Sequence, residues 1–121
     1  MSWDSDAAMV DRQLHALLAA ERAATADRVA MLSQDLEAIV EAGRLVATDD
    51  EHDPEGSTIA FERSQASAFL AGARRHLADL DSALERIDAG DYGRCERCGK
   101  PIAAERLLAR PTARTCIDCA V

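Results

Sequence analysis

The stretch "CERCGKPIAAERLLARPTARTCIDC", which covers residues 95–119, carries the most specific signal in the chain. It contains two Cys-x2-Cys pairs, and the residues 99–115 between them give a separation typical of zinc ribbons. Two residues between cysteines allow a tight turn that aims both thiolates at one ion, and Gly99 can adopt the positive φ that such a turn often needs. The pattern predicts one Zn²⁺ with four ligands, Cys95, Cys98, Cys116 and Cys119.

A shell of four thiolates leaves no coordination position for water, which makes the predicted zinc structural rather than catalytic. Iron in the same cage, as in an electron carrier, and two disulfides are the alternatives. The N-terminal "MSWDSDAAMV" has neither the basic start of a signal peptide nor an apolar membrane span. We therefore expect a cytoplasmic protein without a membrane segment, in which thiols stay reduced and zinc is favoured over disulfides.

Upstream of the cysteines, apolar residues recur at steps of three and four, the pattern of a helix that packs along a seam. In the later of two such segments, only Arg63 interrupts the seam, and Gly90 follows it as a residue type that favours helix termination. This second seam consists of Ile59, Ala66, Leu70, Ala73, Leu77, Leu80, Leu84 and Ile87.

The earlier segment has a seam of its own, in which Gly43 fills one position in register. Its apolar members are Val29, Leu32, Leu36, Ile39 and Val46. Nearer the N-terminus the apolar residues shift in phase, so we expect the helix to change its packing partner there. The shifted residues are Val10, Leu14, Leu17 and Leu18.

The polar stretch "TDDEHDPEGS" separates the two segments, and so short a link makes consecutive helices antiparallel neighbours. Asp53 and Pro54 suit the N-cap and N1 positions of the second helix, with Ser57 as an alternative cap. We predict a mainly α fold, a long antiparallel two-helix coiled-coil hairpin followed by a small C4 zinc finger. The hairpin would occupy residues 1–90, with helices at about 6–47 and 58–89 and an acidic tip at about 48–57, and the finger residues 91–121.

Composition excludes several other classes of protein. Apolar residues make up 48% of the chain but aromatic residues only 3%, and the excess of Ala and Leu favours helices over a β-sandwich. The net charge of −8 repels nucleic acid at long range, so we expect no direct sequence-specific DNA binding. The three histidines lie far apart, and the sequence shows neither a nucleophile–base arrangement nor a glycine-rich phosphate loop, so we expect no enzyme.

Basic residues collect in the predicted finger of this otherwise acidic chain. They form either a solvated face that offsets the thiolate charge or a contact for phosphate groups or an acidic partner. The residues are Arg94, Arg97, Lys100, Arg106, Arg110 and Arg114.

The segment from Ala83 to Cys119 resembles the DksA/TraR family of bacterial C4-type zinc-finger proteins. It shares "YG.C..CG..I", "RL.ARP" and the closing "C..C", and "AFER" at residues 60–63 is also similar. The resemblance implies a partner, RNA polymerase, whose secondary channel admits the hairpin so that the tip changes transcription initiation while the finger braces the base. The tip residues would be Asp49, Asp50, Glu51, Asp53, Glu55 and Ser57.

At the tip, Glu55 retains the acidic position of DksA-like members, whereas Ser57 replaces the alanine found two residues later. An alternative function is that of a zinc-braced helical adaptor, which binds another protein along its hairpin. The tip separates these two functions, because a channel regulator needs the acidic residues and an adaptor tolerates their loss.

Some members of the family act together with the alarmone ppGpp through basic residues. Arg106 and Arg110 match two of these positions, but Asp79 and Ala120 occupy two others. Because a polyphosphate requires converging positive charge, we expect no ppGpp dependence. We also expect a monomer.

Overall fold

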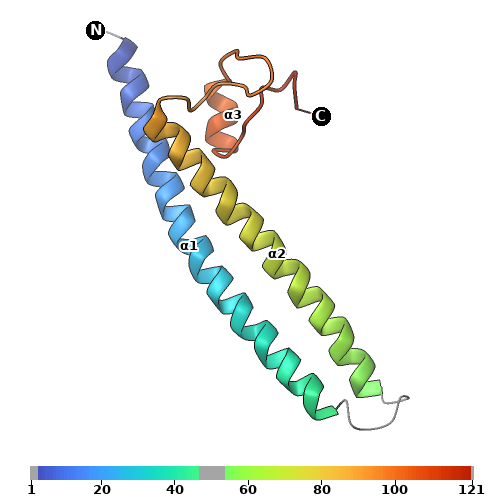
Figure 1. The fold of residues 1–121 in the computed structure, drawn as a ribbon. Coiled ribbons are helices and arrows are strands. Elements are labelled where there is room, and N and C mark those ends of the chain that lie inside the picture. Colours follow the sequence, from blue (N-terminus) through green and yellow to red (C-terminus); the bar gives the residue numbers. More distant parts are fainter. Residues whose placement is uncertain (1–2, 47–53, 121) are drawn as a thin grey trace. The chain divides into compact units, whose positions relative to one another are not determined.

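The structure is a computed structural model that describes residues 3–46 and 54–120, with side chains described for 11–45 and 57–120. Three helices follow one another along the chain, α1 (Trp3–Val46), α2 (Pro54–Ala89) and α3 (Ala104–Ala109) (Figure 1). Within these described ranges there is no β-strand, only an isolated antiparallel bridge between Arg94 and Pro101. The fold is mainly α, with two long helices that pack together and a small zinc finger after them, as predicted.

Two compact units make up the chain, residues 24–77 and residues 1–23 together with 78–121. Within unit 24–77, parts of α1 and α2 lie side by side and antiparallel (Figure 1). Ala66 and Leu70 of α2 are buried, and the other described seam positions of this unit are half-buried. Gly43 faces α2 across the seam, since a Cβ atom there would make van der Waals contact with the Cγ2 atom of Ile59 at 3.4 Å. The seam pattern is therefore confirmed for both helices.

The second unit combines the N-terminal part of α1, the C-terminal part of α2 and the finger. Leu18 of α1 packs with Leu80 and Ala83 of α2 in one buried cluster. Leu14, one turn earlier, packs instead with apolar residues of the finger. The predicted change of partner is confirmed for Leu14, whereas Leu18 still packs against α2.

The end of α2 is fixed by a Schellman motif, in which two backbone N–H groups reach back to the last carbonyls of the helix. The N–H of Gly90 donates to the carbonyl of Ile87 at 3.1 Å, and the N–H of Asp91 donates to that of Arg86 at 2.8 Å. Gly90 has a φ of +82°, which a residue without a Cβ atom adopts at little cost. The predicted helix stop at Gly90 is confirmed.

The segment between the two long helices, 47–53, lies outside the described residues, and so do the side chains of 54–56. Most of the predicted acidic tip therefore has no structural description, although Pro54 is the first residue of α2. The division of the chain into 1–90 and 91–121 stays a prediction. None of the described helices is long and apolar enough to cross a membrane.

Candidate metal centre and basic pocket

The first pair of cysteines lies on a tight turn that follows α2. The N–H of Cys95 donates to the carbonyl of Lys100 at 2.9 Å, and the N–H of Gly99 donates to the carbonyl of Cys95 at 3.0 Å. Gly99 has a φ of +73°, so the predicted need for glycine after the second cysteine is confirmed. These bonds curl the chain so that the side chains of Cys95 and Cys98 lie on the same side of the turn.

The second pair forms a similar turn, and the main chain connects the two. The N–H groups of Cys119 and Ala120 both donate to the carbonyl of Cys116, at 3.1 and 3.0 Å. The N–H of Glu96 donates to the carbonyl of Arg114 at 2.9 Å, which brings the residues beside Cys95 next to those that lead into Cys116.

The four cysteine Sγ atoms lie within 4.8 Å of one another, in the part of the chain that the structure describes. The Sγ atoms of Cys98 and Cys116 are 3.7 Å apart. Four sulfurs at about 2.3 Å from a tetrahedral zinc ion would be separated by about 3.8 Å, so the cluster fits this ion. The chain has one zinc site of the structural, four-thiolate type.

The thiols differ in acidity because their surroundings differ. Hydrogen bonds from the backbone of Cys116 and Cys98 lower the pKa of Cys95 to about 6. Hydrogen bonds with the side chains of Cys116 and Cys95 raise the pKa of Cys119 to about 12. A metal ion that binds all four as thiolates therefore has to displace protons, above all the proton of Cys119.

A small apolar core supports the metal centre. Cys95 packs with Ile102, Leu107 and Ala113, together with Leu14 of α1. The hydroxyl group of Tyr92, which lies between the two core clusters of this unit, donates to the carbonyl of Pro111 at 2.8 Å. Sequence reasoning missed this role of tyrosine, although it belongs to the shared "YG.C" pattern.

Next to the second cysteine pair lies a surface pocket of about 600 Å³. Four guanidinium groups and one carboxylate contribute to its lining, those of Arg97, Arg106, Arg110, Arg114 and Asp79. The pocket thus brings together the two arginines singled out from the sequence. Their settings differ, because the Nε atom of Arg106 donates to the carbonyl of Thr115 at 2.9 Å, whereas Arg110 is exposed.

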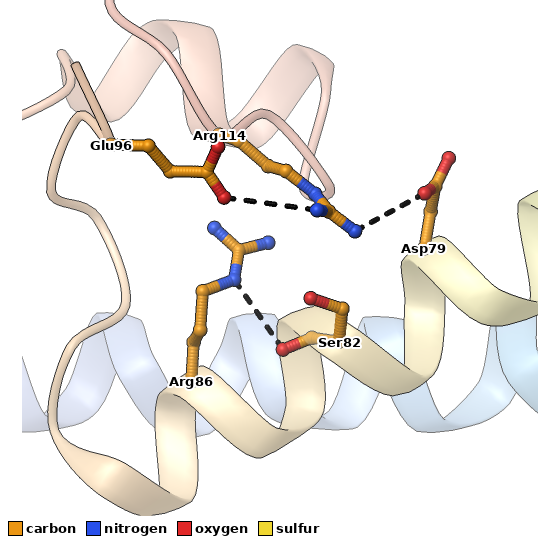
Figure 2. Close-up of polar contacts among 5 residues, drawn as sticks. All are labelled: Asp79, Ser82, Arg86, Glu96 and Arg114. Atoms are coloured by element: carbon orange, nitrogen blue, oxygen red, sulfur yellow. Dashed lines mark hydrogen bonds and ion pairs between the residues drawn. The ribbon is translucent and has the colours of Figure 1, made fainter.

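One ion pair joins the finger to α2 and a second lies within the finger, and sequence reasoning predicted neither of them (Figure 2). An Nη2 atom of Arg114 lies 3.4 Å from the carboxylate of Asp79 on α2. Its Nη1 atom lies 3.7 Å from the carboxylate of Glu96 in the first cysteine turn. Asp79 therefore supplies negative charge to the lining of the basic pocket.

The predicted tip residues are not brought together by any described contact. Asp49, Asp50, Glu51 and Asp53 lie outside the described residues, as does the side chain of Glu55, while Ser57 is exposed on α2. Their role stays a prediction.

Comparison with known proteins supports this description of the finger. The family described as "Prokaryotic dksA/traR C4-type zinc finger" matches residues 90–121. The structure of transcription factor DksA2 from Pseudomonas aeruginosa is similar, with a TM-score of 0.75 and 27% sequence identity over 91% of this chain and 79% of that one. Residues 90–121 therefore form a C4-type zinc finger of the DksA/TraR family.

Among similar proteins, the uncharacterized protein YteA of Bacillus subtilis is 42% identical over 73 residues, which are 60% of this chain and 30% of YteA. The RNA polymerase-binding transcription factor DksA of Haemophilus influenzae is 44% identical over 46 residues, or 38% of this chain and 32% of that protein. The matched segments thus span about a third of these curated relatives.

Proposed function

We propose that this protein is a non-catalytic transcription regulator that binds RNA polymerase and inserts the tip of its hairpin into the secondary channel, where it modulates initiation. The observation that carries the proposal is the likeness to the transcription factor DksA2, which extends over 91% of this chain. A related zinc finger alone would fit many partners, whereas this likeness also includes the two long helices.

The composition of the predicted tip supports the same function. A turn between helices needs a stop and a cap, which Asp53 and Pro54 can supply, but not the surplus of carboxylates around them. The additional acidic residues are Asp49, Asp50, Glu51 and Glu55. Near the catalytic metal ion of a polymerase, such charge can favour one state of the active centre over another.

The proposed effect on initiation does not depend on ppGpp. Asp79 places a carboxylate in the lining of the basic pocket and lies 3.4 Å from Arg114, so part of the positive charge there is already neutralised. Ala120, which also lines the pocket, adds no charge.

The test uses the full, zinc-loaded chain in co-purification with RNA polymerase, followed by in vitro initiation on a ribosomal RNA promoter at matched occupancy. The variant Asp53→Asn/Glu55→Gln removes two tip charges and roughly preserves shape and capping. We expect polymerase binding to persist and the effect on initiation to fall severalfold. Folding should change little, because exposed charges contribute about 0–1 kcal/mol.

The matched control is Asp27→Asn/Glu37→Gln, which removes two charges at exposed positions of α1 and should leave the effect unchanged. If the tip variant keeps the full effect, the tip is a solvated turn and the channel mechanism is wrong.

If the protein does not co-purify with polymerase, the adaptor function is favoured. Exposed aromatic side chains on α2, Phe61 at 68% and Phe69 at 54%, would suit such a protein partner.

A further inference from the structure

Arg86, near the end of α2, has a guanidinium group whose Nη1 and Nη2 atoms are buried and have no hydrogen-bond partner among the described residues. Its Nε atom makes only a long contact of 3.4 Å with the carbonyl of Ser82 in the same helix. Burial lowers the pKa of Arg86, and the positive charge of Arg114 lowers it further. A buried guanidinium is costly unless a negative charge compensates it, so its surroundings should contain that charge.

Glu96 supplies the compensating negative charge. Figure 2 shows the Arg86 side chain rising from α2 toward the carboxylate of Glu96 in the first cysteine turn. The negative charge of Glu96 favours the charged form of Arg86, and the ring of Tyr92 lies 6.0 Å from its guanidinium carbon. No described hydrogen bond joins the Nη atoms of Arg86 to Glu96, so the two groups interact through their opposite charges.

Four charges of alternating sign then follow one another, Asp79, Arg114, Glu96 and Arg86. Asp79 and Arg86 are seven residues apart on α2, so they lie two turns apart on the same helix face. Glu96 belongs to the first cysteine turn, and Arg114 precedes the second. The row therefore attaches both halves of the metal centre to one face of α2.

We propose that Arg86 is a positioning residue, which acts through Glu96 to fix the orientation of the zinc finger on α2. Arg114 and Asp79 make the second attachment, but both are more than two-fifths exposed, and exposed ion pairs contribute little. Arg86 differs because its Nη atoms are buried, and the negative charge of Glu96 favours its charged form. This inference goes beyond the proposed function and does not depend on what the finger binds.

The first test is a double-mutant cycle on the full, zinc-loaded chain, with Arg86→Met, Glu96→Gln and the double variant. The measured quantity is the rate of zinc transfer to an excess of chelator. Neighbouring charges that stabilise each other show coupling in such a cycle. We therefore expect Glu96→Gln to accelerate zinc release about tenfold when Arg86 is present, and less than about twofold when Arg86 is replaced by Met. Equal acceleration in both backgrounds would overturn the proposal.

A second readout separates positioning from general stability. In the wild-type protein, residual dipolar couplings of amides from 78–89 and from 94–119 should fit one alignment tensor. In the variants Arg86→Met and Glu96→Gln, the two sets of couplings should require two different alignment tensors. In Arg86→Lys, which keeps the positive charge, a single tensor should again fit both sets. Glu96→Gln preserves size at an exposed position, so this variant decides the matter even if Arg86→Met fails to fold.

The control is Lys100→Met, which removes an exposed cation from the first cysteine turn. Neither the release rate nor the couplings should change. A single alignment tensor in Glu96→Gln, or a change in Lys100→Met as large as that in Arg86→Met, would show that Arg86 does not position the finger.

Discussion

At the scale of single residues, the four thiols of the metal centre are unequal before zinc arrives. Backbone donors lower the pKa of Cys95 to about 6, while neighbouring thiols raise that of Cys119 to about 12. At neutral pH, Cys95 is therefore largely a thiolate and Cys119 a thiol. Zinc binding to all four sulfurs therefore displaces the proton of Cys119.

The acidity of these thiols leads to a prediction about pH. Because the proton of Cys119 must leave when zinc binds, the apparent zinc affinity should fall about tenfold or more for each unit of decreasing pH between about pH 8 and pH 6. Below pH 6, Cys95 also becomes protonated in the metal-free finger, so the fall should steepen. Competition with a chelator of known pH dependence measures this, and an affinity that does not change with pH would contradict it.

The residues of the site differ in how far the sequence could predict them. Cys95, Cys98 and Gly99 were predictable, because short-range spacing and backbone geometry determine their roles. Arg114 pairs with Asp79 at a separation of 35 positions, and no local pattern reveals such a partner. Arg86 was missed for the same reason, since its importance lies in what surrounds it after folding.

At the scale of secondary-structure elements, the long helices are held by the apolar seam between them. Its periodicity was readable in the sequence because helical geometry places every third or fourth residue on one face. The phase shift near Leu14 indicated a change of partner but could not identify it. The finger supplies that partner through Ile102, Leu107 and Ala113, whose apolar character shows no helical period.

Leu80 provides the test of the seam, since it is only 1% exposed and packs with Leu18 and Ala83. Leu80→Ala should lower the free energy of unfolding by about 2–5 kcal/mol, because it removes buried methyl groups and leaves a cavity. Leu17→Ala is the matched control, as Leu17 is 54% exposed and should cost well under about 1 kcal/mol. Chemical denaturation measures both, and equal losses would mean that the seam lies on another face.

At the scale of the whole molecule, the two compact units depend on different forces. In unit 24–77, the described side chains that pack together come from α1 and α2, whereas the other unit also includes the metal centre. The finger has few buried residues of its own, and one member of its core, Leu14, comes from α1. So small a core needs the additional free energy that metal binding provides.

Removal of zinc should therefore destabilise the finger much more than unit 24–77. In the metal-free protein, or in Cys98→Ser, we expect residues from about 93 onward to lose amide protection while those of 24–45 and 57–77 largely retain it, because zinc-finger folding is coupled to metal binding. Leu14 should become accessible, since its packing partners lie in the finger, whereas Leu18 keeps its contacts with Leu80 and Ala83.

Hydrogen exchange with and without a chelator measures the protection of these amides. Readdition of zinc should restore protection in the wild type but not in Cys98→Ser. A finger that keeps its protection after complete zinc removal would show that its apolar core suffices. Loss of protection throughout 24–77 would show instead that the seam cannot hold the long helices together without the metal centre.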